Sequence, residues 1–138
     1  MHVQSSKQLF EQIQGVDGQL IGDRELAQTV ATAADVTYTA PQILSSIILR
    51  DPAGGARADL FPTAAAIIAA LKNPVRGSFF LVAIRNTADA NETITMTTNT
   101  GLTLSGTMTI AQNNSKLFIV QVTSSTTCSI YSVGTFVH

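Results

Sequence analysis

The sequence predicts a mainly β protein: an antiparallel β-sandwich or barrel of about six to eight short strands, with one short helix and an extended N-terminal arm. Two observations predict this fold class. From Gly77 onward, apolar and polar residues alternate with the period of two that is typical of strands, and turn-forming residues divide the region into short segments. Ahead of that region, residues 62–71 carry the most convincing helical pattern. With 138 residues, the chain fits one domain.

Residues 1–35 carry few large apolar side chains, and we expect them to form an arm ahead of a single β-rich domain at 36–138. Ser5 and Ser6 offer a cap for about two helical turns. Several glycines then interrupt any regular element, and residues 24–34 form a weak helical stretch. A segment with so little to bury also fits a disordered tail, and the sequence leaves that alternative open.

Five elements are expected between the arm and the alternating region. They are a short strand at 36–39, a helical turn at 42–44, a buried strand at 46–50, a turn at 51–57 and the helix at 62–71. The helix has Thr63 as a candidate cap, and Asn73 and Pro74 end it. Its apolar face is formed by Ala64, Ile67, Ile68 and Leu71.

The alternating region predicts six strands. They are expected at 79–85, 92–97, 102–104, 107–110, 116–123 and 129–137. Gly106 separates the third from the fourth and predicts a kink or a bulge. Such short strands at about 8–12-residue spacing are typical of sandwiches and barrels.

Charge is scarce and unevenly distributed along the chain. Charged residues make up 12% of the sequence, about half the usual share, and the formal net charge is −1. Such a chain has no electrostatic footprint for nucleic acid or an anionic membrane, and its copies repel one another little. We therefore expect a protein that assembles, with neither nucleic acid nor membrane as a partner.

The last 52 residues contain only three charged side chains but 13 threonines and 6 serines. Their polar strand face is therefore hydroxylated rather than charged. A hydroxylated face loses less on desolvation than a charged one, which favours an interface between subunits. A solvated face of high strand propensity is the alternative.

The residues that enzymes use are missing from the interior of the chain. The two histidines, His2 and His138, lie at its ends, and Cys128 is the single cysteine. A catalytic triad needs a histidine inside the folded region, and a zinc site needs several histidines or cysteines. Asp89 and Glu92 are close in sequence, and we interpret them as a polar turn. We expect no enzyme activity, no cofactor and no metal.

One charged cluster stands out in the Gly-rich segment that follows the strand at 46–50. Asp51, Arg57 and Asp59 lie there next to Arg50, and they suggest a metal or phosphate site. The segment lacks the ending of a phosphate-binding loop. A turn in which the arginines pair locally with the aspartates is the simpler interpretation, and contact with a neighbouring subunit is the third.

Several segments of the sequence resemble a family of small virion proteins of tailed phages and related viruses. The resemblance covers residues 38–138 and is carried by IILRDPAG (47–54), RAD (57–59), PTAA (62–65), IRNTADANETIT (84–95) and LSGTMTIAQNNSK (104–116). Such proteins are similar to capsid decoration, or cement, proteins and to small fibre-like virion components. The family has no active-site residues to transfer.

The resemblance implies a non-enzymatic structural protein that is made in the host cytoplasm and sits on the capsid surface of the virion. Its expected partners are the major capsid protein and copies of itself, as a homotrimer. The expected partner-binding residues are Arg50, Asp51, Arg57 and Asp59, together with the apolar positions of the arm: Leu9, Phe10, Ile13, Leu20 and Ile21. A tail or fibre module that binds host surface glycans is the alternative.

Overall fold

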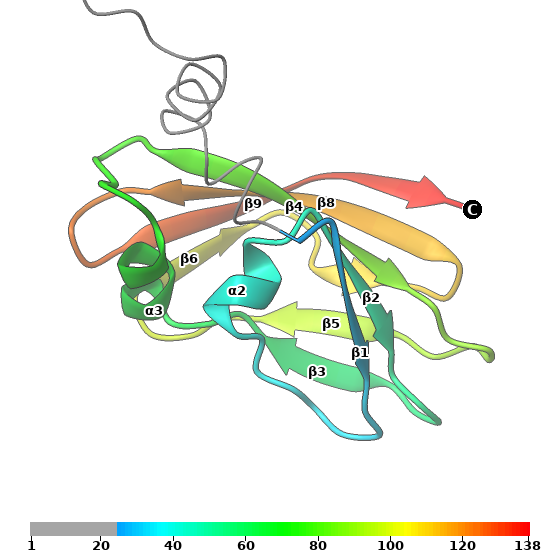
Figure 1. Ribbon diagram of the computed structural model, residues 1–138. Coiled ribbons are helices and arrows are strands. Elements are labelled where there is room, and N and C mark those ends of the chain that lie inside the picture. The colour runs from blue at the N-terminus through cyan, green and yellow to red at the C-terminus, as the bar shows by residue number, and fades with distance from the viewer. Residues whose placement is uncertain (1–24) are drawn as a thin grey trace, which may run out of the picture.

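The structure is a computed structural model that describes residues 25–138, and two β-sheets form its framework (Figure 1). The larger sheet has the order β1 (Ala27–Ala31), β2 (Ile47–Asp51), β4 (Phe79–Asn86), β8 (Asn114–Val122), β9 (Cys128–Val137) and β6 (Leu102–Ser105). The smaller sheet has the order β3 (Arg57–Leu60), β5 (Ile94–Thr97) and β7 (Thr109–Ile110). Two short helices, α2 (Ala40–Ile43) and α3 (Ala64–Ala70), complete the described part of the chain.

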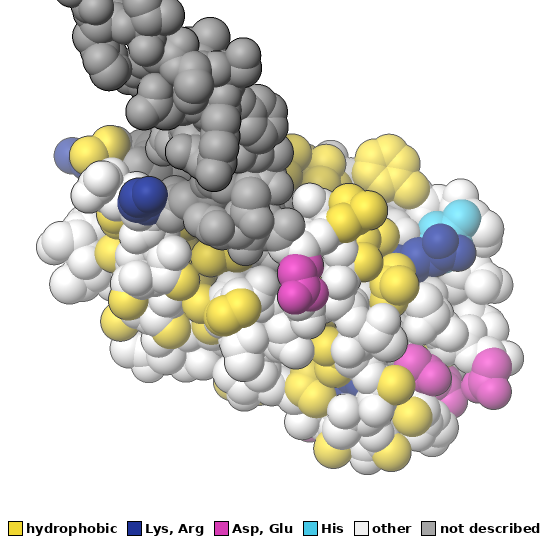
Figure 2. Space-filling model, in the orientation of Figure 1, with side chains coloured by type: hydrophobic (Ala, Val, Ile, Leu, Met, Phe, Trp, Pro, Cys, Tyr) yellow, Lys and Arg dark blue, Asp and Glu magenta, His cyan; other side chains and the backbone are white. Residues whose placement is uncertain are grey.

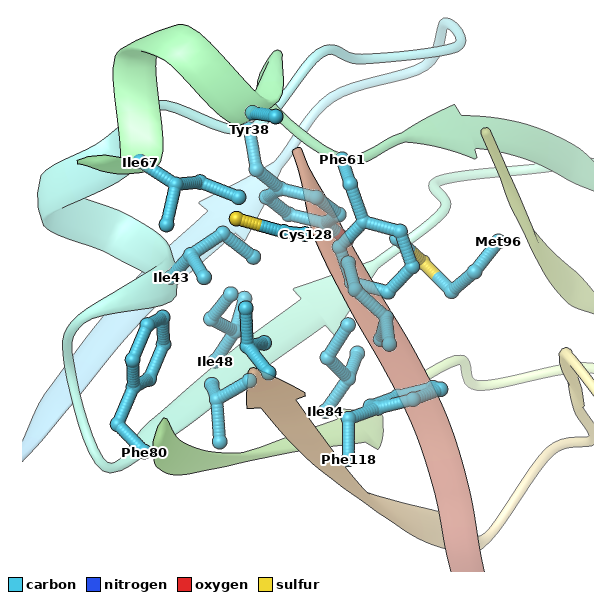
Figure 3. Packing of buried hydrophobic residues seen from close by; sticks show 14 of the residues in the cluster. Tyr38, Ile43, Ile48, Phe61, Ile67, Phe80, Ile84, Met96, Phe118 and Cys128 are labelled. Atoms are coloured by element: carbon cyan, nitrogen blue, oxygen red, sulfur yellow. The ribbon is translucent and has the colours of Figure 1, made fainter. Parts of the chain in front are cut away.

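The core lies between the two sheets and under the helices. Figure 3 shows side chains from both sheets and from both helices meeting in one cluster. Phe61, which follows β3, meets Phe118 of β8 edge to face, with ring centroids 5.5 Å apart and an interplanar angle of 81°. Both rings are fully buried. Edge-to-face pairs of this kind stabilise a core by about 0.5–1.5 kcal/mol beyond their buried area, and this pair joins the two sheets.

The mainly β, sandwich-like fold that the sequence predicts is confirmed, but the strand pairing is mixed rather than antiparallel. Strands β1, β2 and β4 run parallel, as do β3 with β5 and β6 with β9. Only β4, β8 and β9, and the pair β5 and β7, are antiparallel. The described residues form nine strands instead of six to eight. Periodicity marks a strand but not the direction of its neighbour, because side chains alternate in both kinds of sheet.

The helices begin where the sequence places their caps. Thr63 accepts a hydrogen bond from the backbone N–H of Ala66 and starts α3, as predicted. The predicted helical turn near residue 42 is α2, which starts in a capping box between Thr39 and Gln42. Gly101 lets α3 approach the chain closely, since a Cβ atom there would lie 2.7 Å from the Cβ of Ala64. Neither helix of residues 25–138 is long and apolar enough to cross a membrane.

The segment that ends the predicted arm is part of the sheet. The weak helix expected at 24–34 is wrong, because Ala27–Ala31 forms β1 and pairs with β2 in parallel. The helix propensity of alanine and glutamine is a weak prior, and the exposed edge of a sheet overrides it. The strand expected at 36–39 is reduced to one bridge, between Thr37 and Leu60. The short strand β3 was not predicted, and it begins at the last residue of the turn expected at 51–57.

The six strands expected after Gly77 are all present within a few residues of their predicted ends. Gly106 does more than kink a strand. Its φ of +96° lets the chain leave β6 in the larger sheet and enter β7 in the smaller one. The irregularity in the ladder lies instead between β8 and β9, where the register shifts at Leu117 and Phe118.

Candidate assembly surface

The charged cluster after β2 divides into a buried pair and two surface residues. Arg50 and Asp59 are both fully buried, and two bonds join them. The Nε of Arg50 donates to Oδ2 of Asp59 over 2.7 Å, and its Nη2 donates to Oδ1 over 3.1 Å. This bidentate geometry is the strong form of an ion pair. The local pairing of an arginine with an aspartate is therefore present for these two residues.

The remaining donors of Arg50 hold the chain segment that follows β1. Nη1 donates to the carbonyls of Thr32 and Asp51 over 2.9 and 2.7 Å, and Nη2 donates to the carbonyl of Ala34 over 2.8 Å. Residues 25–35 thus belong to the β domain through β1 and through Arg50, so the boundary predicted at residue 35 is corrected. With every donor occupied inside the domain, Arg50 and Asp59 are not available to a partner on this surface.

Tyr38 completes this buried network. Its hydroxyl donates to Oδ2 of Asp59 over 2.8 Å, and the backbone N–H of Val36 donates to Oδ1 over 3.1 Å. Burial, with the neighbouring Asp59 carboxylate, raises the pKa of Tyr38 far above its usual value. The phenol therefore keeps its proton in the folded protein, and the network is a structural one.

The raised pKa predicts a loss of stability in alkali. Above about pH 10 the phenol of an unfolded chain ionises, whereas folded Tyr38 stays protonated. The contribution of Tyr38 to the free energy of unfolding is therefore fully present below about pH 10. It is lost as the pH rises further, by up to about 1.4 kcal/mol per pH unit. We expect Tyr38→Phe to flatten this slope in urea unfolding series at pH 8 to 11. Tyr131→Phe, at the exposed tyrosine, serves as the control, and an equal effect of both variants would contradict the interpretation.

Asp51 and Arg57 stay at the surface but do not pair with each other. Oδ1 of Asp51 accepts from the backbone N–H of Ala53, and Nε of Arg57 donates to the carbonyl of Pro52 over 2.8 Å. These bonds fix the turn between β2 and β3. Both side chains are half-buried, which leaves part of each for contact with a partner.

The other predicted residues lie apart from this cluster. The arm positions Leu9, Phe10, Ile13, Leu20 and Ile21 lie outside the described residues. Asp89 lies exposed in its turn, but Glu92 is corrected: it is 8% exposed, and its Oε2 has no hydrogen-bond partner. Burial raises the pKa of the Cys128 thiol in the core. Within residues 25–138, no three His, Cys, Asp or Glu side chains group as metal ligands.

The outer face of the larger sheet, the face that points away from the core, is apolar. Leu81, Ile119 and Tyr131 are direct neighbours across β4, β8 and β9. Ile47 and Ala83 continue the pattern on β2 and β4. The large side chains at the outward positions that remain most exposed are Phe79 (64%), Leu81 (43%), Tyr131 (39%), Val133 (51%) and Phe136 (58%).

This outer face carries almost no charge. At the outward positions of the larger sheet, the charged side chains are Asp51 and Arg85, and both lie at the end where β2 and β4 finish. Threonines, serines and Gln121 fill most of the other outward positions. Figure 2 shows another view of the surface, on which the charged side chains outside the grey residues stand in a few small groups. Exposed apolar patches of this kind on soluble proteins mark interaction sites.

The hydroxyl-bearing strands that the sequence predicts are divided between the two sheets, and the outer face of the smaller sheet lacks the large aromatic side chains of the larger one. Thr95 of β5 lies between Ala58 of β3 and Thr109 of β7, and all three are outward positions. The structure thus presents two candidate faces, one apolar and one hydroxylated. The apolar face has the larger gain on burial, because its exposed side chains are large.

Sequence reasoning missed the apolar outer face, although a signal was present. Residues 79–84 and 117–120 are continuous apolar runs, whereas 92–97 alternates strictly. A continuous run places apolar side chains on both faces of a strand. Two adjacent strands of this kind, β4 and β8, produce a sheet that is apolar on the outside as well as the inside.

Comparisons with known proteins found no relative of this chain. No family model matches the chain, and no curated protein or solved structure is significantly similar to it.

Proposed function

We propose that this protein is a non-enzymatic virion structural protein, a decoration or cement protein that binds the shell of the major capsid protein and stabilises the particle. The observation that carries the proposal is the apolar outer face of β4, β8 and β9, with its exposed Phe79, Leu81 and Tyr131. A face of this kind, on a chain with a net charge of −1, supports association rather than chemistry.

In this proposal the outer face joins copies of the chain into a homotrimer. Burying one large apolar side chain contributes up to about 1.5–3 kcal/mol, so the exposed side chains of this face favour association. The surrounding hydroxyl groups can exchange water for hydrogen bonds across an interface at lower desolvation cost than charges can. Asp51 and Arg85, at the end of the face, then lie at the rim, where charged residues of interfaces are usually found.

Contact with the shell is assigned to other parts of the chain. The apolar positions Leu9, Phe10, Ile13, Leu20 and Ile21 are proposed as anchors on the major capsid protein. Segments that order on binding cover large surfaces. Many copies on one shell would add small contacts per copy into a large gain in particle stability.

Binding of the purified protein to bare shells tests the proposal. Shells assembled from the major capsid protein of the same virus are titrated with the full chain, and bound protein is measured after sedimentation. We expect saturation at a simple ratio to the capsid protein, and a rise in the temperature at which the shells break open. Shells that bind no protein under these conditions would contradict the proposal.

The alternative function, a tail or fibre module that binds host surface glycans, has one observation in its favour. The rings of Phe79, Tyr131 and Phe136 are exposed on the outer face, and sugar-binding sites use exposed rings for stacking. A glycan array separates the two functions. Glycan binding that Phe79→Ala removes, with no binding to shells, would favour the alternative.

A further inference from the structure

A shallow hollow, wide open to solvent, lies where the turn between β6 and β7 faces the last part of β9. Apart from Lys116 and the apolar Val133, its lining consists of glycines and hydroxylated residues: Gly106, Thr107, Thr109, Ser132, Gly134 and Thr135. Lys116 is the only charged side chain of the lining.

Lys116 is an unusual lysine, because it is buried without a counter-charge. It occupies an inward position of β8 and is only 4% exposed. Its Nζ donates to Oγ1 of Thr135 over 2.9 Å, and no carboxylate of residues 25–138 forms an ion pair with it. An ammonium group has three donors, and this bond uses one of them. Burial lowers the pKa of Lys116.

The sheet geometry builds the hollow around this ammonium group. The register shift between β8 and β9 places Thr135 opposite Lys116. On the other wall, Gly106 approaches β9 so closely that a Cβ atom there would lie 2.5 Å from Oγ of Ser132. Bulges and close glycine approaches of this kind often adjoin binding sites, since they re-aim side chains and admit a ligand.

We propose that this hollow binds an acidic monosaccharide, with the carboxylate of the sugar on Lys116 and its hydroxyl groups on the threonine and serine hydroxyls. A single ammonium group matches the single charge of a carboxylate, whereas a phosphate dianion would call for a second cation that the lining lacks. The hydroxyl lining of Thr107, Thr109 and Ser132 can both donate to a polyol and accept from it. This inference does not depend on where the protein sits in a particle.

Calorimetric titration of the full chain with glucuronate tests the proposal, with glucose as the neutral sugar of the same shape. We expect binding of glucuronate and at least tenfold weaker binding of glucose. Lys116→Met should weaken glucuronate binding by about ten- to a hundredfold, as expected for the loss of a charged hydrogen bond. Lys72→Met, at an exposed lysine outside the hollow, should bind glucuronate like the unaltered chain. Equal binding of both sugars, or no effect of Lys116→Met, would overturn the proposal.

Amide NMR of the unaltered chain locates the site without any substitution. Glucuronate should shift the signals of Gly106 and Gly134, which line the hollow, and leave those of Gly54 and Gly77 in place. Inorganic phosphate is titrated in the same way. Tighter binding of phosphate than of glucuronate, or shifts outside the hollow, would overturn the assignment to an acidic sugar.

The thermal stability of Lys116→Met separates a binding role from a structural one. Methionine fills a similar volume without a charge. If Lys116 serves binding rather than the fold, the Tm of Lys116→Met should be about 2–6 °C higher than that of the unaltered chain. Stability and binding are therefore expected to move in opposite directions. A fall in Tm together with unchanged glucuronate binding would show that Lys116 serves only the fold.

Discussion

Replacing Asp59 with asparagine is expected to lower the free energy of unfolding by about 3–5 kcal/mol, because Arg50 would then keep a buried charge with no partner. Both side chains are fully buried, so solvent cannot replace the lost carboxylate. Tyr38 loses its charged acceptor at the same time. Urea unfolding at pH 7 measures the difference between the two chains.

The matched control is Asp51→Asn, a substitution of the same kind at the surface end of β2. Asp51 bonds only the backbone of its own turn through its carboxylate, so we expect a change of less than about 1 kcal/mol. Since Arg50 also holds the carbonyls of Thr32 and Ala34, amide exchange in β1 should accelerate in Asp59→Asn. An effect of Asp59→Asn as small as that of the control would contradict the role of the pair.

Two lysines on the outer face are expected to abolish self-association. The double variant Leu81→Lys and Val133→Lys places charge on β4 and β9, at two exposed positions of the apolar face. Each of the two substitutions removes the burial of an apolar side chain, which contributes about 1.5–3 kcal/mol to the interface. The association constant should therefore fall by at least about a hundredfold. Sedimentation equilibrium should show a trimer for the unaltered chain and a monomer for the variant. Because both positions are exposed in the single chain, the monomer should stay folded.

The hydroxylated face of the smaller sheet supplies the control. Ala58→Lys and Thr95→Lys add the same two charges there, on neighbouring positions of β3 and β5. We expect this variant to remain a trimer. If it dissociates while the Leu81 and Val133 variant does not, the hydroxylated face is the interface and the apolar one is not.

The sequence predicts the fold class and most strands because their signal is local. Alternation in residues 92–97, the Thr63 cap and the glycines at turns are properties of short segments, and the structure confirms the elements that they mark. Pairing direction and the place of β1 are properties of distant segments. Ala27–Ala31 becomes a strand because the edge of β2 is available to it, and that edge is invisible in a local pattern.

In the candidate site, too, the features that depend on a short segment could be predicted and those that depend on distant segments could not. The turn at Asp51 and Arg57 could be predicted from proline and glycine, but the burial of Arg50 and Asp59 could not, because Asp59 lies in a strand that only pairing with β5 creates. The position of Lys116 inside the sandwich depends on the strand phase of β8, and its hollow depends on a register shift. Neither feature has a sequence motif.

The copy number of this protein in purified particles tests the central claim most directly. Quantitative mass spectrometry gives its ratio to the major capsid protein. A cement role over the whole shell predicts about one copy per capsid protein, or a simple fraction such as one-third. One trimer for every nine capsid proteins gives one-third. A handful of copies per particle would contradict that role and favour a tail or fibre position, and complete absence from the particles would contradict both.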